Sequence, residues 1–292
     1  MPPGRARAPL PTTATDLPPV ELAWTATLDE ALAALDLTLE PGPRRAIEDQ
    51  VRLLSAWNAA INLTAIRDPA SVAVQHVADS LAALPLLRNL MRDTALGDPE
   101  ANDALTLLDV GSGGGYPGLP LGVTLPAARL GLVESVGKKA RFLAAVAGVA
   151  AAALAAAGDD VAAPAIDVLP VRAEALGSDP ANRAAWSIVT VRAVAPMARL
   201  AELCLPLVAV GGWLVAWKRD SGGALEAELA AAAPRIRAFG GAPPRAERSV
   251  PPDRLPALAD HRLVLVRRIA DVARRPPSAS RATRRGKSHR LP

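Results

Sequence analysis

Apolar runs of strand length alternate with helical patterns from residue 105 to residue 267. Several of these runs lack the apolar–polar alternation of a half-exposed strand, which is typical of strands buried on both faces of a parallel sheet. Strands that alternate with helices predict an α/β fold with a doubly wound, mostly parallel sheet. The predicted strands are 105–110, a run ending at Glu134, 166–172, 186–191, 213–217 and 262–267.

The first hundred residues show helical patterns and no strands. Apolar residues recur at three- and four-residue steps between Leu28 and Trp57. A further helix is predicted to begin at Asp68-Pro69, because Asp is a favoured N-cap and Pro fits the first helical position. The chain therefore divides into four predicted parts: a Pro-rich, disordered N-terminus (1–20), a helical portion (21–103), an α/β domain (104–270) and a disordered tail (271–292).

Composition argues against several classes of protein. Cys204 is the single cysteine, which rules out an internal disulfide, argues against a cysteine-based metal site and suits a reducing cytosol. No uninterrupted apolar run reaches the ~18 residues that a membrane span needs, and the N-terminus lacks the apolar core of a secretory signal. We expect a cytoplasmic protein with no metal site and no membrane partner.

The positive charge is concentrated at the end of the chain. Residues 262–292 contain ten Arg or Lys against one acid, Asp271, although the whole chain has a net charge of only +4. Such a tail favours an anionic partner, with nucleic acid the first candidate, and Arg284, Arg285 and Lys287 are the predicted contacts. A solvated tail that only improves solubility explains the same charge equally well.

The stretch from Leu105 to Glu134 predicts a nucleotide-type site. A buried strand ends at Asp109-Val110, and glycines follow at alternate positions, where they allow backbone angles that a β-carbon forbids and let a ligand approach the main chain. Pro117 then fits the first turn of a helix. Glu134 ends the next strand, at the sheet edge where ligands of open α/β sheets bind.

Two cofactors are compatible with this glycine turn. The string from Gly113 to Gly118 satisfies G-x-G-x-x-G, the dinucleotide fingerprint, but the first glycine of that fingerprint should follow the strand directly. The spacing Asp109-x-Gly111-x-Gly113-x-Gly115 instead resembles the first motif of class I S-adenosylmethionine-dependent methyltransferases, whose fold is Rossmann-like. In that class an acid at the end of the second strand holds the ribose hydroxyls, a role that Glu134 matches.

Several separate motifs extend this likeness over roughly residues 45–220. In order and spacing the chain resembles the RsmG (GidB) family, bacterial methyltransferases that methylate N7 of a guanine in 16S ribosomal RNA. The motifs are Trp57-Asn58, Ile61-Asn62-Leu63-Thr64, His76-x-x-Asp79-Ser80, the stretch from Asp109 to Pro120, and Arg192-Ala193-Val194-Ala195. The resemblance implies S-adenosylmethionine as cofactor and 16S rRNA or the small ribosomal subunit as partner.

The site residues follow from the turn and from the resemblance together. The family implies cofactor contacts in the glycine turn, after the third strand and after the fourth. The predicted cofactor residues are Asp109, Gly111, Gly113, Gly115, Tyr116, Glu134, Ala173, Glu174 and Arg192. The predicted RNA contacts are Arg192, Lys218 and the three tail residues, because strand ends face the ligand crevice and the tail is basic.

His76 and Asp79 lie three residues apart and therefore share one helix face. They could form a polar pair facing the cofactor or RNA cleft, or a buried pair that locks the helical layer onto the sheet. Cys204, Trp213 and Trp217 lie in apolar surroundings and are predicted to belong to the core.

A methyltransferase of this kind requires no general base, because guanine N7 carries a free lone pair and no proton. We expect orientation and proximity to supply the rate acceleration, with His76 and Asp79 the only catalytic candidates. Two other functions remain open: a nicotinamide-dependent oxidoreductase using the G-x-G-x-x-G string, and a non-catalytic RNA-binding or ribosome-assembly module using the basic tail. Nothing in the sequence demands more than a monomer.

Overall fold

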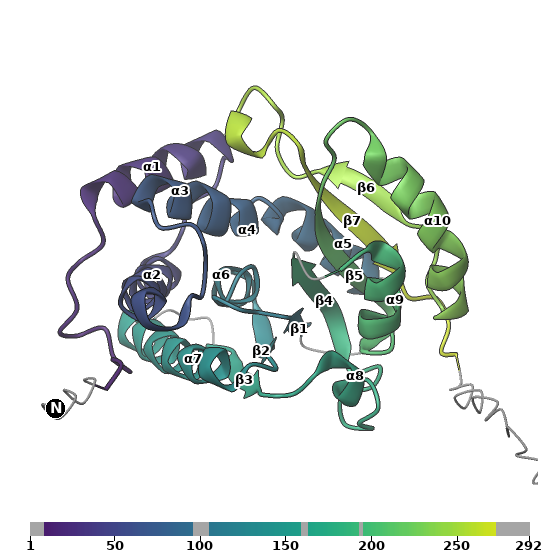
Figure 1. Cartoon of the computed structure of the whole chain (residues 1–292), viewed down its shortest axis with the longest axis horizontal. Coiled ribbons are helices and arrows are strands. Elements are labelled where there is room, and N and C mark those ends of the chain that lie inside the picture. Colours follow the sequence, from purple (N-terminus) through teal and green to yellow (C-terminus); the bar gives the residue numbers. More distant parts are fainter. Residues whose placement is uncertain (1–8, 96–104, 159–162, 193–194, 273–292) are drawn as a thin grey trace, which may run out of the picture.

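A seven-stranded sheet forms the centre of the computed structural model, which describes residues 9–95, 105–158, 163–192 and 195–272 (Figure 1). The strand order is β3-β2-β1-β4-β5-β7-β6. The first five strands pair in parallel, whereas β7 runs antiparallel to both of its neighbours. The strands are β1 Leu105–Val110, β2 Ala127–Val133, β3 Ala165–Leu169, β4 Trp186–Arg192, β5 Val208–Arg219, β6 Arg245–Arg248 and β7 His261–Arg267.

Helices cover both faces of this sheet, which confirms the predicted doubly wound α/β fold. On one face, α2, α6 and α7 pack on the inward side chains of β1 and β2 (such as Leu107 and Leu132). On the other face, α9 and α10 pack on side chains such as Leu108 and Val189. The helices are α1 Leu22–Ala34, α2 Pro41–Ile61, α3 Pro69–Val72, α4 Asp79–Leu81, α5 Leu84–Ala95, α6 Gly118–Thr124, α7 Gly137–Ala157, α8 Ala173–Leu176, α9 Met197–Cys204 and α10 Ala224–Ala238, with a π-helical segment Ala73–Ala78 and a 3-10 turn Pro256–Leu258.

Several predicted boundaries differ from the structure for local reasons. The helical stretch from Leu28 to Trp57 is two helices, because Asp36 adopts a left-handed conformation after α1 and prolines begin α2. The third strand ends at Leu169, short of residue 172, because Pro170 has no N–H to give to the ladder. Strand β6 was not predicted, since its sequence RAER lacks an apolar run.

Part of the N-terminus is ordered, against the prediction of disorder over 1–20. Residues 9–20 lie along α2, where the Trp57 indole N–H donates to the Pro11 carbonyl at 2.7 Å. Arg52 on the same helix donates to the Pro18 carbonyl at 2.8 Å and also to Leu17. Two long side chains of α2 thus hold a segment that has no periodicity of its own. Residues 1–8, like the tail beyond 272, lie outside the described residues.

Two helical segments, Pro69–Arg92 and Gly137–Ala157, are long and apolar enough to cross a membrane by length and composition alone. Both are packed within the fold: α7 lies between α2 and β3, and Val77, Leu81 and Leu84 of the other segment are fully buried. Core helices of a globular protein meet the same criterion. Their hydropathy is therefore accounted for by burial.

The glycine turn after β1 depends on close packing of α6 against the sheet. A β-carbon at Gly118 would lie 2.5 Å from Asp109 Cβ and 2.8 Å from Leu132 Cδ2. Asp109 is buried beneath the turn, where Thr190 Oγ1 donates to its Oδ1 at 2.9 Å. Burial raises the pKa of Asp109 to about 6, although the Thr190 hydrogen bond opposes the shift.

We predict that Gly118→Ala destabilises the fold by roughly 1–3 kcal/mol, because overpacking forces α6 away from β1. Gly114→Ala is the matched control, since a β-carbon there meets only ordinary contacts at 3.4–3.5 Å. Denaturant unfolding of both variants gives the comparison. Equal losses, or no loss at Gly118, would contradict the packing described for α6.

Candidate active site

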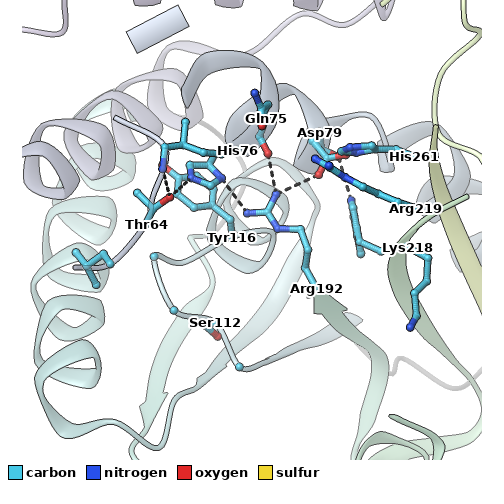
Figure 2. Close-up of a pocket in the computed structure, with 16 residues that line it drawn as sticks. Thr64, Gln75, His76, Asp79, Ser112, Tyr116, Arg192, Lys218, Arg219 and His261 are labelled. Carbon is cyan, nitrogen blue, oxygen red and sulfur yellow. Dashed lines mark hydrogen bonds and ion pairs between the residues drawn. The ribbon is translucent and has the colours of Figure 1, made fainter. Parts of the chain in front are cut away.

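A pocket of about 480 Å³ opens at the carboxyl ends of β1, β4 and β5, on the side of the N-terminal helices (Figure 2). This position is the topological switch point, where the strand order reverses between β1 and β4 and ligands of open α/β sheets bind. Its walls come from the glycine turn, the 63–79 segment, the ends of β4 and β5, and the start of β7. The lining residues are Leu63, Thr64, Ile66, Gln75, His76, Asp79, Gly111, Ser112, Gly113, Gly114, Tyr116, Arg192, Trp217, Lys218, Arg219 and His261.

The glycine turn forms the floor of the pocket. Gly111, Gly113 and Gly115 have φ angles of 75°, 54° and 87°, which lie in the left-handed region that glycine adopts without strain. The N–H of Gly111 donates to the Val133 carbonyl at 2.9 Å, and the N–H of Gly113 donates to Glu134 Oε2 at 3.2 Å. The turn is therefore anchored on the end of β2.

The helical layer also holds this turn. Gln50 on α2 is fully buried and donates its side-chain N–H to the Gly114 carbonyl at 2.9 Å. A β-carbon at Gly115 would lie 2.7 Å from Gln50 Nε2, so glycine is needed at that position for two reasons. Gln50 was not predicted as a site residue, because a single Gln on an amphipathic helix carries no sequence signal.

A π-helical segment, Ala73–Ala78, carries the upper wall of the pocket. Segments of this type are rare and occur frequently at functional sites. This segment places His76 and the Gln75 carbonyl over the end of β4, and Asp79 follows directly at the start of α4. The pair lines the pocket, and Asp79 also joins the helical layer to the sheet through Arg192. Contact of either side chain with cofactor or RNA stays a prediction.

Arg192, the last residue of β4, connects these groups (Figure 2). Its Nη1 donates to the Gln75 carbonyl and to Asp79 Oδ2, both at 3.1 Å. Its Nη2 lies 3.2 Å from His76 Nδ1. The guanidinium charge is thus compensated by Asp79 inside the pocket wall.

These contacts define the protonation of His76. A guanidinium only donates, so His76 Nδ1 must accept from Arg192, and the Nε2–H donates to Thr64 Oγ1 at 2.8 Å. Burial, followed by the charge of Arg192, lowers the pKa of His76 to about 4. The imidazole is therefore neutral at pH 7, with both nitrogens engaged.

Tyr116 packs against the other side of this imidazole. The two rings are stacked with centroids 4.8 Å apart and planes 13° from parallel. Burial raises the pKa of the Tyr116 phenol, and its hydroxyl has no hydrogen-bond partner within the described part of the chain. Tyr116 therefore lines the pocket as a neutral phenol whose hydroxyl is buried.

His261, the first residue of β7, completes the network and was not predicted. Its Nδ1 lies 2.7 Å from Asp79 Oδ1, while the Trp217 indole N–H donates to the Asp79 carbonyl at 3.1 Å. Trp217 was predicted as core and is buried, but it also lines the pocket. His261 could have been suspected from one signal, its position at the start of the closing strand.

The remaining predicted residues lie around the pocket. Asp109 lies beneath the turn, where it organises the backbone. Glu134 is buried at the end of β2, and its Oε1 accepts from the N–H of Val136, at the N-cap of α7, at 2.8 Å. Ala173 and Glu174 begin α8 after β3, outside the pocket lining, and Glu174 pairs with Arg199.

The candidate RNA contacts differ in whether an acidic side chain already neutralises their positive charge. Lys218 lines the pocket, but its Nζ lies 2.6 Å from Glu228 Oε1, so its charge is compensated. Arg219, which was not predicted, is exposed at the rim and forms no ion pair with any described residue. Arg284, Arg285 and Lys287 lie outside the described residues. No group of three or more potential metal ligands occurs within the described ranges.

Comparison with known proteins places this site in a family. The family model described as rRNA small subunit methyltransferase G (GidB) matches residues 44–237, a range that contains every pocket residue except His261. The ribosomal RNA small subunit methyltransferase G of Dehalococcoides mccartyi (strain CBDB1) is 37% identical over 241 residues, which cover 82% of this chain and 89% of the relative. The protein of the same name from Roseiflexus sp. (strain RS-1) is 38% identical over 217 residues, covering 74% of this chain and 80% of the relative.

Among solved structures, the antibiotic-resistance methyltransferase Kmr is 21% identical, with a TM-score of 0.44, and the match covers 62% of this chain and 92% of Kmr. At this identity and TM-score, the similarity carries no information about the site. The family model covers the glycine turn, the π-helical segment and Arg192 together. The chain therefore belongs to the GidB family of rRNA small subunit methyltransferases G.

Proposed function

We propose that this chain transfers the methyl group of S-adenosylmethionine to N7 of a guanine in the 16S rRNA of the small ribosomal subunit. The proposal rests on one observation above all: the pocket lies beside the glycine turn, and His76 in its wall is a neutral imidazole with both ring nitrogens engaged. Family membership supports the cofactor and the class of RNA, and it disfavours both the nicotinamide-dependent oxidoreductase and the non-catalytic binding module.

The residues of the turn fit the cofactor. The left-handed glycines leave open space above Gly113, where a β-carbon would meet only the Gly111 carbonyl at 3.8 Å. Tyr116, which also lines the pocket, has a buried hydroxyl with no hydrogen-bond partner among the described residues. Each oxygen of Glu134 accepts one backbone N–H and keeps a lone pair for a ribose hydroxyl. Asp109, Ala173, Glu174 and Arg192 complete the proposed cofactor site, with Asp109 acting through the turn.

When bound, S-adenosylmethionine supplies an electrophilic methyl group on a sulfonium. Guanine N7 has a lone pair and no proton, so the protein is not required to remove one. This matches His76, which is neutral and whose two nitrogens are already bonded to Arg192 and Thr64. The chemical contribution of the chain is therefore to hold the reactants in line and to exclude water.

The network around Arg192 is suited to that task. His76, Asp79 and His261 are buried, Arg192 is half-buried, and the hydrogen bonds among them join separate elements, so these groups are held in position before a ligand arrives. Pocket volume also suits a small cofactor together with one base, since sites of this kind range over ~300–1,000 Å³. We propose that RNA phosphates meet Arg219 and the tail residues Arg284, Arg285 and Lys287, with Lys218 and Arg192 nearer the base. The enzyme is proposed to act in the cytoplasm as a monomer, without a membrane partner.

Cofactor binding is tested by thermal unfolding with S-adenosylhomocysteine and, separately, with NAD. At a hundred times its dissociation constant a ligand adds about 2.7 kcal/mol, so we expect a clear rise in Tm with the homocysteine and none with NAD. Glu134→Ala should reduce that rise, because the ribose would lose its acceptor. A rise with NAD alone would contradict the proposed cofactor.

The absence of a general base is tested with His76→Asn, whose amide oxygen can still accept from Arg192. Removing a general base costs about 10²–10⁴-fold in rate, whereas we expect a loss of less than about tenfold in kcat. Since the pKa of His76 is about 4, the wild-type rate should also stay level between pH 6 and pH 8. A loss of a thousandfold, or a wild-type rate that rises through pH 6–7, would contradict methyl transfer without a general base.

A further inference from the structure

His261 lies outside the matched family range, yet it lines the pocket. It begins β7, the last strand along the sequence, which lies between β5 and β6 in the sheet, and it pairs with Arg219 of β5. Its side chain is 10% exposed and faces Asp79 across the space between the sheet and the helical layer (Figure 2). Among the described residues, only one of its two ring nitrogens has a hydrogen-bond partner.

The bonded nitrogen is Nδ1. It lies 2.7 Å from Asp79 Oδ1, and an ionised carboxylate only accepts, so Nδ1 carries the proton. The other nitrogen, Nε2, has no hydrogen-bond partner among the described residues, and the nearest acid, Asp260, is 3.8 Å away. The contact with Asp79 is therefore the only side-chain hydrogen bond of this ring within the described part of the chain.

That contact also fixes Asp79. The Asp79 side chain is 2% exposed, and its two oxygens accept from different donors: Oδ1 from His261 and Oδ2 from Arg192. Without the Nδ1–H, Oδ1 would be a buried acceptor with no donor, which costs free energy. The guanidinium could then satisfy both oxygens as a bidentate pair, and Nη2 would leave His76.

We propose that His261 is a positioning residue for methyl transfer, which acts through Asp79 to hold Arg192 in its shared contacts with Gln75 and His76. The inference rests on the proposed function. The positioning role belongs to Nδ1, the nitrogen bonded to Asp79. A residue that only filled space would not depend on that nitrogen. His261 touches neither cofactor nor RNA in this account.

The experiment compares His261→Asn with His261→Gln. The Asn amide nitrogen occupies nearly the place of Nδ1 and can donate to Asp79, whereas the longer Gln side chain places its amide near Nε2. With saturating S-adenosylmethionine and small-subunit rRNA, we expect kcat of the Asn variant within about twofold of wild type and kcat of the Gln variant reduced about tenfold. KM for the cofactor should change less than twofold in both variants.

A structural role alone would lower kcat of both variants in step with their Tm, and that result would overturn the proposal. Equal activity of wild type, Asn and Gln variants would overturn it as well. Both variants should keep a two-state melt, which is measured alongside.

A second readout does not depend on activity. The chain has three histidines, His76, His261 and His289, so long-range ¹H–¹⁵N spectra can be assigned with the variants in hand. We expect His261 to be protonated at Nδ1 in the wild-type protein, and a neutral ring protonated at Nε2 alone would refute the proposal. If wild type did not methylate rRNA at all, the proposed function would fail while the Nδ1 tautomer could still be present.

Discussion

One guanidinium group joins the two halves of this molecule. Arg192 ends β4, at the centre of the sheet, and its three contacts all lie on the helical layer at residues 75–79. A charge removed from water is tolerated only when it is paired and its remaining hydrogen bonds are made, and breaking such a pair costs several kcal/mol. These contacts join the sheet to the helical layer at the pocket. The residues that connect the two layers are therefore the residues that line the pocket.

This arrangement explains how the pocket can be shaped before any ligand binds. The glycine turn is fixed from below by the end of β2 and from the side by Gln50. The opposite wall is fixed by Arg192, Asp79 and His261, which come from a parallel strand, a helix and an antiparallel strand. Reactants that enter such a site are oriented by groups already in place, which is the contribution that a reaction without proton transfer requires.

The sequence predicted the parts of the site that backbone geometry dictates. Glycines at alternate positions after a buried strand predict a tight turn, and the turn after β1 has left-handed angles at Gly111, Gly113 and Gly115. The acid at the end of the next strand, Glu134, accepts a hydrogen bond from that turn, and its contact with a cofactor stays a prediction. Gln50, Thr64 and His261 were missed because each acts through a partner distant in the chain, 64, 12 and 182 residues away. Hydrophobic periodicity and motif spacing along the sequence do not identify partners that are distant in the chain. The same limit applies to Lys218, whose predicted free charge is compensated by Glu228.

If the Arg192–Asp79 pair holds the helical layer on the sheet, the two side chains must be energetically coupled. A double-mutant cycle measures that coupling most directly. Unfolding free energies of wild type, Asp79→Asn, Arg192→Met and the double variant at pH 7 give the interaction energy of the pair. Contacting residues in one network are typically coupled by about 0.5–3 kcal/mol, and we expect a favourable value near the upper part of that range, roughly 2 kcal/mol. A coupling below about 0.5 kcal/mol would show that the helical layer is held to the sheet by apolar packing alone, and Arg192 would lose its place at the centre of the site.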